Sequence, residues 1–191
     1  IEEIKGESKL TKSELTNLMC YGMYPGIVSE TDTTGKEFVL KNITTNYMYK
    51  DIFMFENIHK PQVFEDLVKM LSYQIGNLVS INELSTKLGV SRLTVEKYIN
   101  LLEQSYIIKV VRSFVGNKRG ELKKAFKIYF IDLGIRNAVI DNIDNNLQER
   151  KDKGVIFENF CVMELFKQNS DEAFPPEIMF WRTETKLEID I

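Results

Sequence analysis

The sequence predicts an α+β fold organised around a short helix–turn–helix, and three observations support this prediction. Residues 62–76 and 80–105 place apolar side chains at helical spacing, with glycines and capping serines at the breaks. Residues 106–114 and 125–131 are rich in β-branched and aromatic residues, which favour strands. A polar, glycine-containing segment separates these two runs and is typical of a hairpin turn. Three helices followed by a hairpin predict a winged helix–turn–helix.

The helix ends are the most detailed part of this prediction. Ser80 can cap a helix, and Glu83 can return the bond in a capping box. Gly89 ends that helix, because the residue after a helix commonly needs positive φ. Ser91 then caps the next helix, which runs to Ser105. The apolar positions of the three helices predict one shared core: Leu67, Leu71, Leu84, Leu88, Val95, Ile99 and Leu102.

The outward face of the helix at 91–105 is polar, and the hairpin turn is basic. In a helix–turn–helix, the second helix enters the DNA major groove, while basic turns contact phosphates. The side chains expected to meet DNA are Ser91, Arg92, Thr94, Lys97 and Asn100 on the helix and Lys118, Arg119, Lys123 and Lys124 on the hairpin. We therefore expect double-stranded DNA as the partner.

The charge distribution favours this face. The chain has a net charge of −3, but residues 62–130 hold 11 Lys and Arg against 6 Asp and Glu. Against this, lysines in a turn are often simply solvated, and Glu96 and Glu103 lie on the same helix. A module that binds another protein, without a nucleic-acid partner, is therefore the alternative.

The chain divides into three predicted parts. Residues 1–61 form a helical lead-in that Pro25 and Gly26 interrupt, with Leu40, Ile43, Tyr47 and Ile52 facing inward. Residues 62–130 form the winged helix–turn–helix. Residues 131–191 contain the helical DLGIRN stretch, a polar loop or linker at 141–153, a helix after Gly154, and two short strand-like runs.

The sequence lacks the residue patterns that several classes of function require. Cys20, Cys161 and the single His59 do not form a zinc-site pattern, and we expect both cysteines to be buried thiols. No phosphate-binding GxxxxGK[ST] loop occurs, so this stretch should not hydrolyse ATP and needs no cofactor for it. No apolar run approaches the ~20 residues of a membrane span, which favours a cytoplasmic protein without membrane contact. From spacing alone, Glu158 and the acids of the last strand could bind a divalent cation.

Six segments then carry a family resemblance. They are YPGIV at 24–28, YKDI at 49–52, the block at 74–108, KIYFIDLGIRN at 127–137, GVIFENF at 154–160 and FWRTETKLEID at 180–190. In this order they resemble the C-terminal half of prokaryotic ATPases that join an N-terminal AAA-type module to a largely uncharacterised C-terminal domain. The first residue is not methionine and the last run is strand-like, so we expect a fragment of a longer protein.

The resemblance implies a winged helix followed by a restriction-endonuclease-like fold of the PD-(D/E)xK type. Glu158 matches the helix acid and Asp190 the strand acid, so the resemblance implies catalytic and metal-binding roles for both. The Glu-x-Lys of the next strand has no counterpart, so the nuclease-like unit is incomplete and we expect no cleavage by these residues alone. The resemblance also implies ATP and Mg²⁺ in the parent protein, with oligomers formed through the missing ATPase module.

These observations rank three functions. The first is the DNA-binding or targeting region of an AAA-type ATPase. The second is a metal-dependent nuclease domain completed only beyond residue 191. The third is the protein-interaction module.

Overall fold

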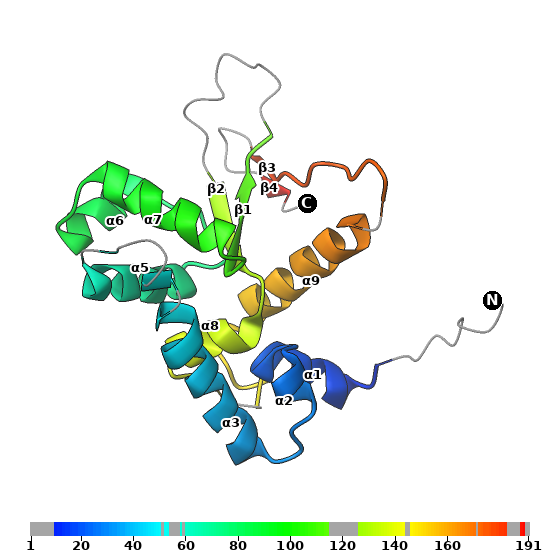
Figure 1. Cartoon of the computed structure of the whole chain (residues 1–191). Coiled ribbons are helices and arrows are strands. Elements are labelled where there is room, and N and C mark those ends of the chain that lie inside the picture. The colour runs from blue at the N-terminus through cyan, green and yellow to red at the C-terminus, as the bar shows by residue number, and fades with distance from the viewer. Residues whose placement is uncertain are drawn as a thin grey trace.

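The structure is a computed structural model of the whole chain, shown in Figure 1. It describes residues 10–50, 52–53, 58, 60–114, 126–143, 146–170, 172–182 and 188–189. The elements are α1 (Lys12–Tyr21), α2 (Pro25–Val28), α3 (Thr33–Asn42), the π-helix η1 (Ile43–Tyr49), α5 (Pro61–Tyr73), α6 (Ile81–Leu88), α7 (Arg92–Gln104), β1 (Ile108–Arg112), β2 (Phe126–Phe130), α8 (Leu133–Val139), α9 (Lys153–Ser170), β3 (Trp181–Arg182) and β4 (Glu188–Ile189). The described fold is thus mixed α and β, and it is mostly helical.

The antiparallel pair β1–β2 lies between two groups of helices. Its register pairs Ile108 with Phe130 and Arg112 with Phe126. Because side chains alternate across a strand, Ile108 and Phe130 join the larger core with α5, α6 and α7, while Val111 and Tyr129 join a smaller core with α9. Figure 1 shows α5–α7 on one side of the pair and α9 on the other. A second antiparallel pair, β3–β4, aligns Trp181 with Ile189.

The caps of α6 and α7 follow the sequence prediction with one exception. The Ser80 hydroxyl accepts a hydrogen bond from the Glu83 N–H at 3.3 Å, but the Glu83 carboxylate does not return the bond. It instead binds Lys87 Nζ at 2.6 Å, one turn along the helix, where the opposite charge attracts it. Gly89 ends α6 with φ of 64°, and Ser91 caps α7.

The predicted core of these helices is confirmed. Leu102 and Leu84 are fully buried, and Leu88 is half-buried but packs against the same core. The larger core also contains Leu40 of α3 and Leu133 of α8. One core therefore joins side chains from all three predicted parts of the chain, although the boundaries near residues 61 and 130 stay predictions.

One prediction for the first part of the chain needs correction. Pro25 and Gly26 do not interrupt the helical lead-in, because Pro25 begins α2 at the first helical position, where a missing N–H costs nothing. Leu40 and Ile52 are buried as predicted, and Ile43 packs on the core from η1, while the side chain of Tyr47 lies outside the described part.

The cysteine prediction is half right. Cys20 is buried at the end of α1, whereas Cys161 is exposed on α9. A small apolar residue does not by itself reveal which face of a helix it occupies, since that depends on what packs against the helix.

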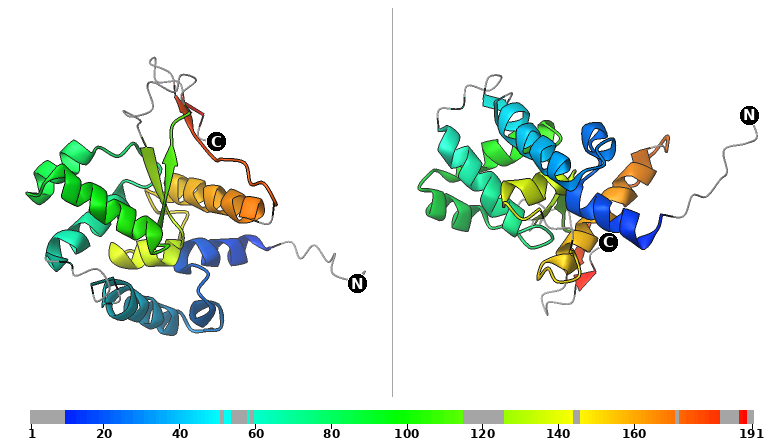
Figure 2. Two further views of the ribbon diagram at one scale, coloured as in Figure 1. Left: turned by 45° about the horizontal axis from the view of Figure 1, so that its top comes forward. Right: turned by 90° about the horizontal axis from the view of Figure 1, so that it is seen from below.

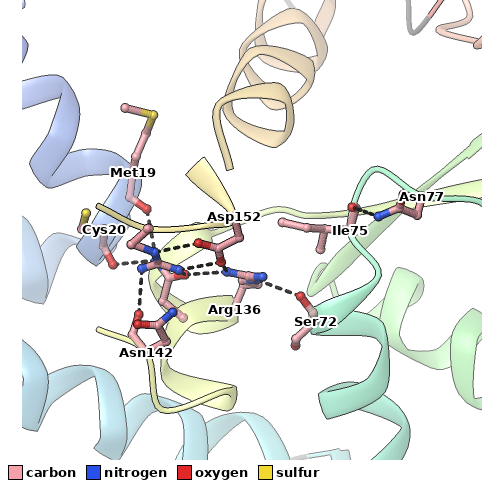
Figure 3. A network of polar contacts seen from close by, with 10 residues as sticks. Met19, Cys20, Ser72, Ile75, Asn77, Arg136, Asn142 and Asp152 are labelled. Carbon is pink, nitrogen blue, oxygen red and sulfur yellow. Dashed lines mark hydrogen bonds and ion pairs between the residues drawn. The ribbon is translucent and has the colours of Figure 1, made fainter. Parts of the chain in front are cut away.

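The polar segment after α8 is a loop but not a linker. Figure 3 shows Arg136 of α8 beside Asp152, and the Arg136 Nε donates to the Ser72 carbonyl of α5 at 2.8 Å. Arg150 is also buried and donates to both Asp152 oxygens at 2.9 Å. Asn137 donates to the carbonyls of α1 at Met19 and Cys20. This network joins the loop to α1, α5 and α8. Arg136, Asn137 and Arg150 are therefore buried, and Asp152 is half-buried.

The lead-in helices lie against α8. In the lower part of Figure 1 and from below in Figure 2, α1 and α3 run beside α8. Asp132 caps α8 by accepting from the Ile135 N–H at 3.0 Å, and it also accepts from the Met23 N–H at 2.7 Å. Gly134 faces the Tyr21 carbonyl so closely that an added Cβ would lie 2.0 Å from it. These contacts hold the start of α8, the DLGIRN stretch, against the end of α1 directly after β2.

Candidate nucleic-acid interface

The outward face of α7 carries the helix residues that the sequence singled out. Ser91, Arg92, Lys97 and Asn100 are exposed. Thr94 is half-buried because its side chain turns back to the cap, with its hydroxyl 2.9 Å from the Ser91 hydroxyl. Four of the five candidates are therefore available to a ligand, and the fifth is part of the helix cap.

A groove of about 770 Å³ runs along this face at the turn between α6 and α7. The predicted residues Ser91, Thr94 and Lys97 line it, and Arg92 lies between them in sequence. Sequence reasoning missed two other members of the lining, Lys60 and Leu93. Leu93 is 77% exposed. A usable signal was its position outside the stripe of Val95, Tyr98, Ile99 and Leu102, which marks it as an apolar residue that the core does not use.

The electrostatics of the groove favour an anionic ligand. Within the described part of the chain, Arg92 and Lys97 are in no ion pair, in contrast to Lys87 with Glu83. The Ser91 hydroxyl accepts from the Thr94 N–H at 3.1 Å, so the first two amides of α7, at Arg92 and Leu93, have no acceptor among the described groups. Such helix N-termini attract anions through these amides and the helix dipole.

The structure does not test the candidate residues of the hairpin. Lys118, Arg119, Lys123 and Lys124 fall between 115 and 125 and lie outside the described residues. Their predicted contact with DNA phosphates stays a prediction.

The candidate nuclease acid Glu158 lies on α9, away from the groove. Its carboxylate accepts a hydrogen bond from the Tyr129 hydroxyl at 2.7 Å and lies 3.8 Å from the Nζ of the buried Lys127. It also approaches Gly76, where an added Cβ would lie 2.9 Å from Oε1. In the described part of the chain, Glu158 is thus the ion-pair partner of the buried Lys127, and its predicted metal-binding role stays a prediction. Its second predicted member, Asp190, lies outside the described residues.

Two protein-family models match this chain, each over a different stretch. Residues 12–146 match the model described as Domain of unknown function (DUF8612), which covers most of the chain and includes α5–α7, the groove and β1–β2. The chain belongs to the DUF8612 family. Residues 153–191, from α9 to the end, match a second model, Domain of unknown function (DUF4143). The DUF8612 match ends before α9, so Glu158 falls in the DUF4143 stretch.

The DUF8612 chain also resembles longer proteins. An uncharacterized protein of Haemophilus influenzae is 24% identical over 172 residues, which cover 87% of this chain and 41% of that protein. An uncharacterized protein of Mycobacterium tuberculosis is 26% identical over 123 residues, covering 64% of this chain and 27% of that protein. This chain therefore spans less than half the length of these relatives. No solved structure gives a significant match.

One further property concerns membranes. Among the helices in the described part of the chain, none is both long enough and apolar enough to cross a bilayer.

Proposed function

We propose that α5, α6, α7 and the β1–β2 pair form a winged helix that binds double-stranded DNA. The observation that carries this proposal is the exposed Lys97 in the groove, with the exposed Arg92 and two helix N-terminal amides beside it at the start of α7. Arg92 would meet a base edge, because arginine recognises guanine with two hydrogen bonds. Lys97 would neutralise a phosphate.

The length of α7 suits this role. Arg92–Gln104 forms a continuous helix whose apolar stripe is held by the core, so its outward face is presented rigidly. Asn100 lies two turns beyond Arg92 on that face and is exposed. An asparagine can recognise adenine with its amide, so the face offers two base-reading groups and one phosphate contact.

A titration of labelled duplex DNA at several salt concentrations tests the proposal. We expect micromolar binding at best near physiological salt, with steep weakening above it. Lys97→Ala should reduce the slope of log affinity against log salt by about 0.9, the value for one phosphate contact. Arg92→Ala should cost about 1–3 kcal/mol at one base pair of a preferred site.

The matched control is Lys151→Ala, which removes the same charge from the exposed loop before α9. It should leave both the affinity and the slope nearly unchanged. Absence of binding to any duplex at low salt would refute the proposal, and so would equal effects of Lys97→Ala and Lys151→Ala.

Leu93 favours a second candidate, in which the same groove binds a protein. A leucine that is 77% exposed in the centre of a polar face can anchor a partner's apolar side chain. Leu93→Ser separates the two functions, because it should leave phosphate-driven DNA affinity largely intact but remove an apolar anchor.

The wider proposal concerns the whole protein. DUF4143 is commonly found in the C-terminal regions of AAA-type ATPases, and residues 153–191 match it. We infer that this chain is the DNA-binding or targeting region of such an ATPase, whose other module would bind ATP and Mg²⁺. In the full-length protein, duplex DNA should then stimulate ATP hydrolysis, and Arg92→Ala with Lys97→Ala should abolish the stimulation but not the basal rate.

A further inference from the structure

The backbone of β1 has an outer edge that β2 does not use. The Ile131 N–H donates to the Ile107 carbonyl at 3.0 Å, which fixes the alternation of the antiparallel ladder. Hydrogen-bonded pairs therefore fall at every second residue, and the polar groups of Ile108, Val110 and Arg112 point away from β2. Two contacts agree, since Arg112 accepts from the Phe180 N–H and Val110 donates to a side chain.

This outer edge is only partly occupied. The Phe180 N–H donates to the Arg112 carbonyl at 3.2 Å, and the Phe114 N–H donates to the Phe180 carbonyl at 2.7 Å. The Val110 N–H donates to the Glu103 carboxylate at 3.0 Å, so a side chain takes the place that a strand carbonyl would occupy. The Val110 carbonyl has no outward partner among the described groups, and Val110 is half-buried. Ile108 is fully buried, so the accessible part of this edge lies at Val110.

The chain's own neighbouring segment does not complete this edge. Phe180 bridges in the parallel direction to Ser113, directly after β1, so the preceding residues run back along β1. In this register Ile178 faces the Val110 carbonyl, and Pro176, which has no N–H, faces the Ile108 carbonyl. No hydrogen bond joins Ile178 to β1 among the described groups, so a gap remains between this segment and β1.

The gap is a groove of about 680 Å³ with apolar walls. Its lining includes Tyr106 at the end of α7, Met163 and Phe166 of α9, and Ile178. Tyr106 is 79% exposed. A strand lying on the edge would point alternate side chains towards the α9 wall and towards Tyr106.

Two cations flank the open edge on opposite faces of β1. Lys109 lies on the α9 side with its Nζ 5.1 Å from the centre of the Phe166 ring, and Arg112 is exposed on the other side. Within the described part of the chain neither is in an ion pair. Of the acids in the lining, Glu103 is held by the Val110 N–H and would be displaced by an incoming strand, while Glu177 is exposed.

We propose that the outer edge of β1 is a docking site for an extended, acidic peptide segment of another protein. The peptide adds a strand beside Val110, and one of its carbonyls replaces the Glu103 carboxylate on the Val110 N–H. Its apolar side chains fill the groove, and its acidic side chains pair with Lys109 and Arg112. This site is separate from the α7 groove and does not depend on DNA binding.

The test is fluorescence polarisation of the 191-residue chain with a labelled peptide of alternating valine and glutamate, about six residues long, which spans the open edge. Glu103→Ala removes the group that competes for the Val110 N–H and a like charge, so binding should tighten about fivefold. Lys109→Glu with Arg112→Glu should weaken binding at least about tenfold. Val110→Pro removes the outward N–H without touching the β1–β2 ladder and should abolish binding.

Circular dichroism and urea unfolding establish that each variant is folded. Should Val110→Pro not fold, the opposite signs expected for Glu103→Ala and the charge-reversal pair still decide the question. A control peptide with N-methyl groups on alternate amides cannot pair as a strand and should not bind, and a lysine-for-glutamate peptide should bind weakly.

Four results would overturn the proposal. They are no binding of the valine–glutamate peptide, equal binding of the N-methylated peptide, weaker binding by Glu103→Ala, and displacement of the peptide by duplex DNA, which would make the cations a nucleic-acid contact. Sedimentation that shows a dimer lost in Val110→Pro would assign the edge to a second copy of the chain instead.

Discussion

The two edges of the β1–β2 pair differ in how completely their outward backbone groups are hydrogen-bonded. On the β2 edge, Asn159 of α9 acts as a short strand, because its amide donates to the Phe130 carbonyl and accepts from the Phe130 N–H, both at 2.8 Å. The Gly76 N–H binds the Ile128 carbonyl at 3.2 Å, and the Val79 N–H binds the Phe126 carbonyl at 2.9 Å. On the β1 edge, one carboxylate and the single residue Phe180 replace this continuous set.

The difference indicates that the β2 edge contributes more to the stability of the fold than the β1 edge. Asn159 and Phe130 are fully buried, so a polar group that loses its partner there cannot hydrogen-bond to water instead. Glu103 is half-buried at the end of α7 and can exchange its bond for one with solvent or with a partner. Four substitutions measure this contrast, two of them in the network of the buried Arg136 and the half-buried Asp152.

The largest effect should come from opening the β2 edge. Asn159→Leu keeps the branching of the side chain but leaves the N–H and the C=O of Phe130 unpaired in the core, and we expect a loss of about 4 kcal/mol in unfolding free energy. Urea denaturation measures it. Gln168→Leu on the exposed side of α9 is the control and should change stability by less than about 0.5 kcal/mol. Equal losses would mean that Asn159 does not close the edge.

Arg136→Met should come next. It removes the bonds to the Ser72 carbonyl, to the Asn137 side chain and to Asp152, and we expect a loss of about 3 kcal/mol, because Arg150 still neutralises Asp152. The same change at the exposed Arg112 is the control and should cost less than about 0.5 kcal/mol. Thermal or urea unfolding compares the two directly, and similar costs would contradict a structural role for the network.

The network should also respond to acid. Burial raises the pKa of Asp152, but hydrogen bonds from Arg150 and Arg136 outweigh it and hold the pKa well below its usual range. Because the folded pKa is lowered, its stabilisation is complete above the unfolded pKa near ~4 and disappears as the pH falls towards the folded pKa. Asp152→Asn should therefore cost about 2 kcal/mol at pH 7 and progressively less below ~4.

The control for this titration is Asp141→Asn, which breaks the exposed pair with Lys41. Its cost should stay below about 1 kcal/mol at every pH, because surface pairs contribute little. A constant difference between Asp152→Asn and the parent chain down to acid would contradict the lowered pKa.

The smallest effect on stability should come from the open edge. Glu103→Ala removes one hydrogen bond at a half-exposed amide and replaces glutamate by a better helix former, so we expect a change within about 1 kcal/mol in urea unfolding. The comparison of the edges fails if this change costs as much as Asn159→Leu.

The candidate groove was predicted in part. Its polar members on α7 follow from helical spacing once Val95, Ile99 and Leu102 are assigned to the core, because the opposite face must then be exposed. Leu93 was missed because only the polar residues outside the buried stripe were taken as candidates, and Lys60 because it comes from the segment before α5. Spacing within one helix carries no information about a neighbour contributed by another segment.

The sequence by itself determined the local structure of this protein. The caps at Ser80, Gly89 and Ser91, the apolar stripes of α5–α7 and the two β-branched runs follow from interactions between residues a few positions apart. Only the tertiary structure decided what Arg136, Asn159 and Glu103 do. From the sequence alone, a polar side chain on a helix is expected to face water. It is buried, or hydrogen-bonds to a strand edge, only where the fold brings distant backbone groups that lack hydrogen-bond partners next to it.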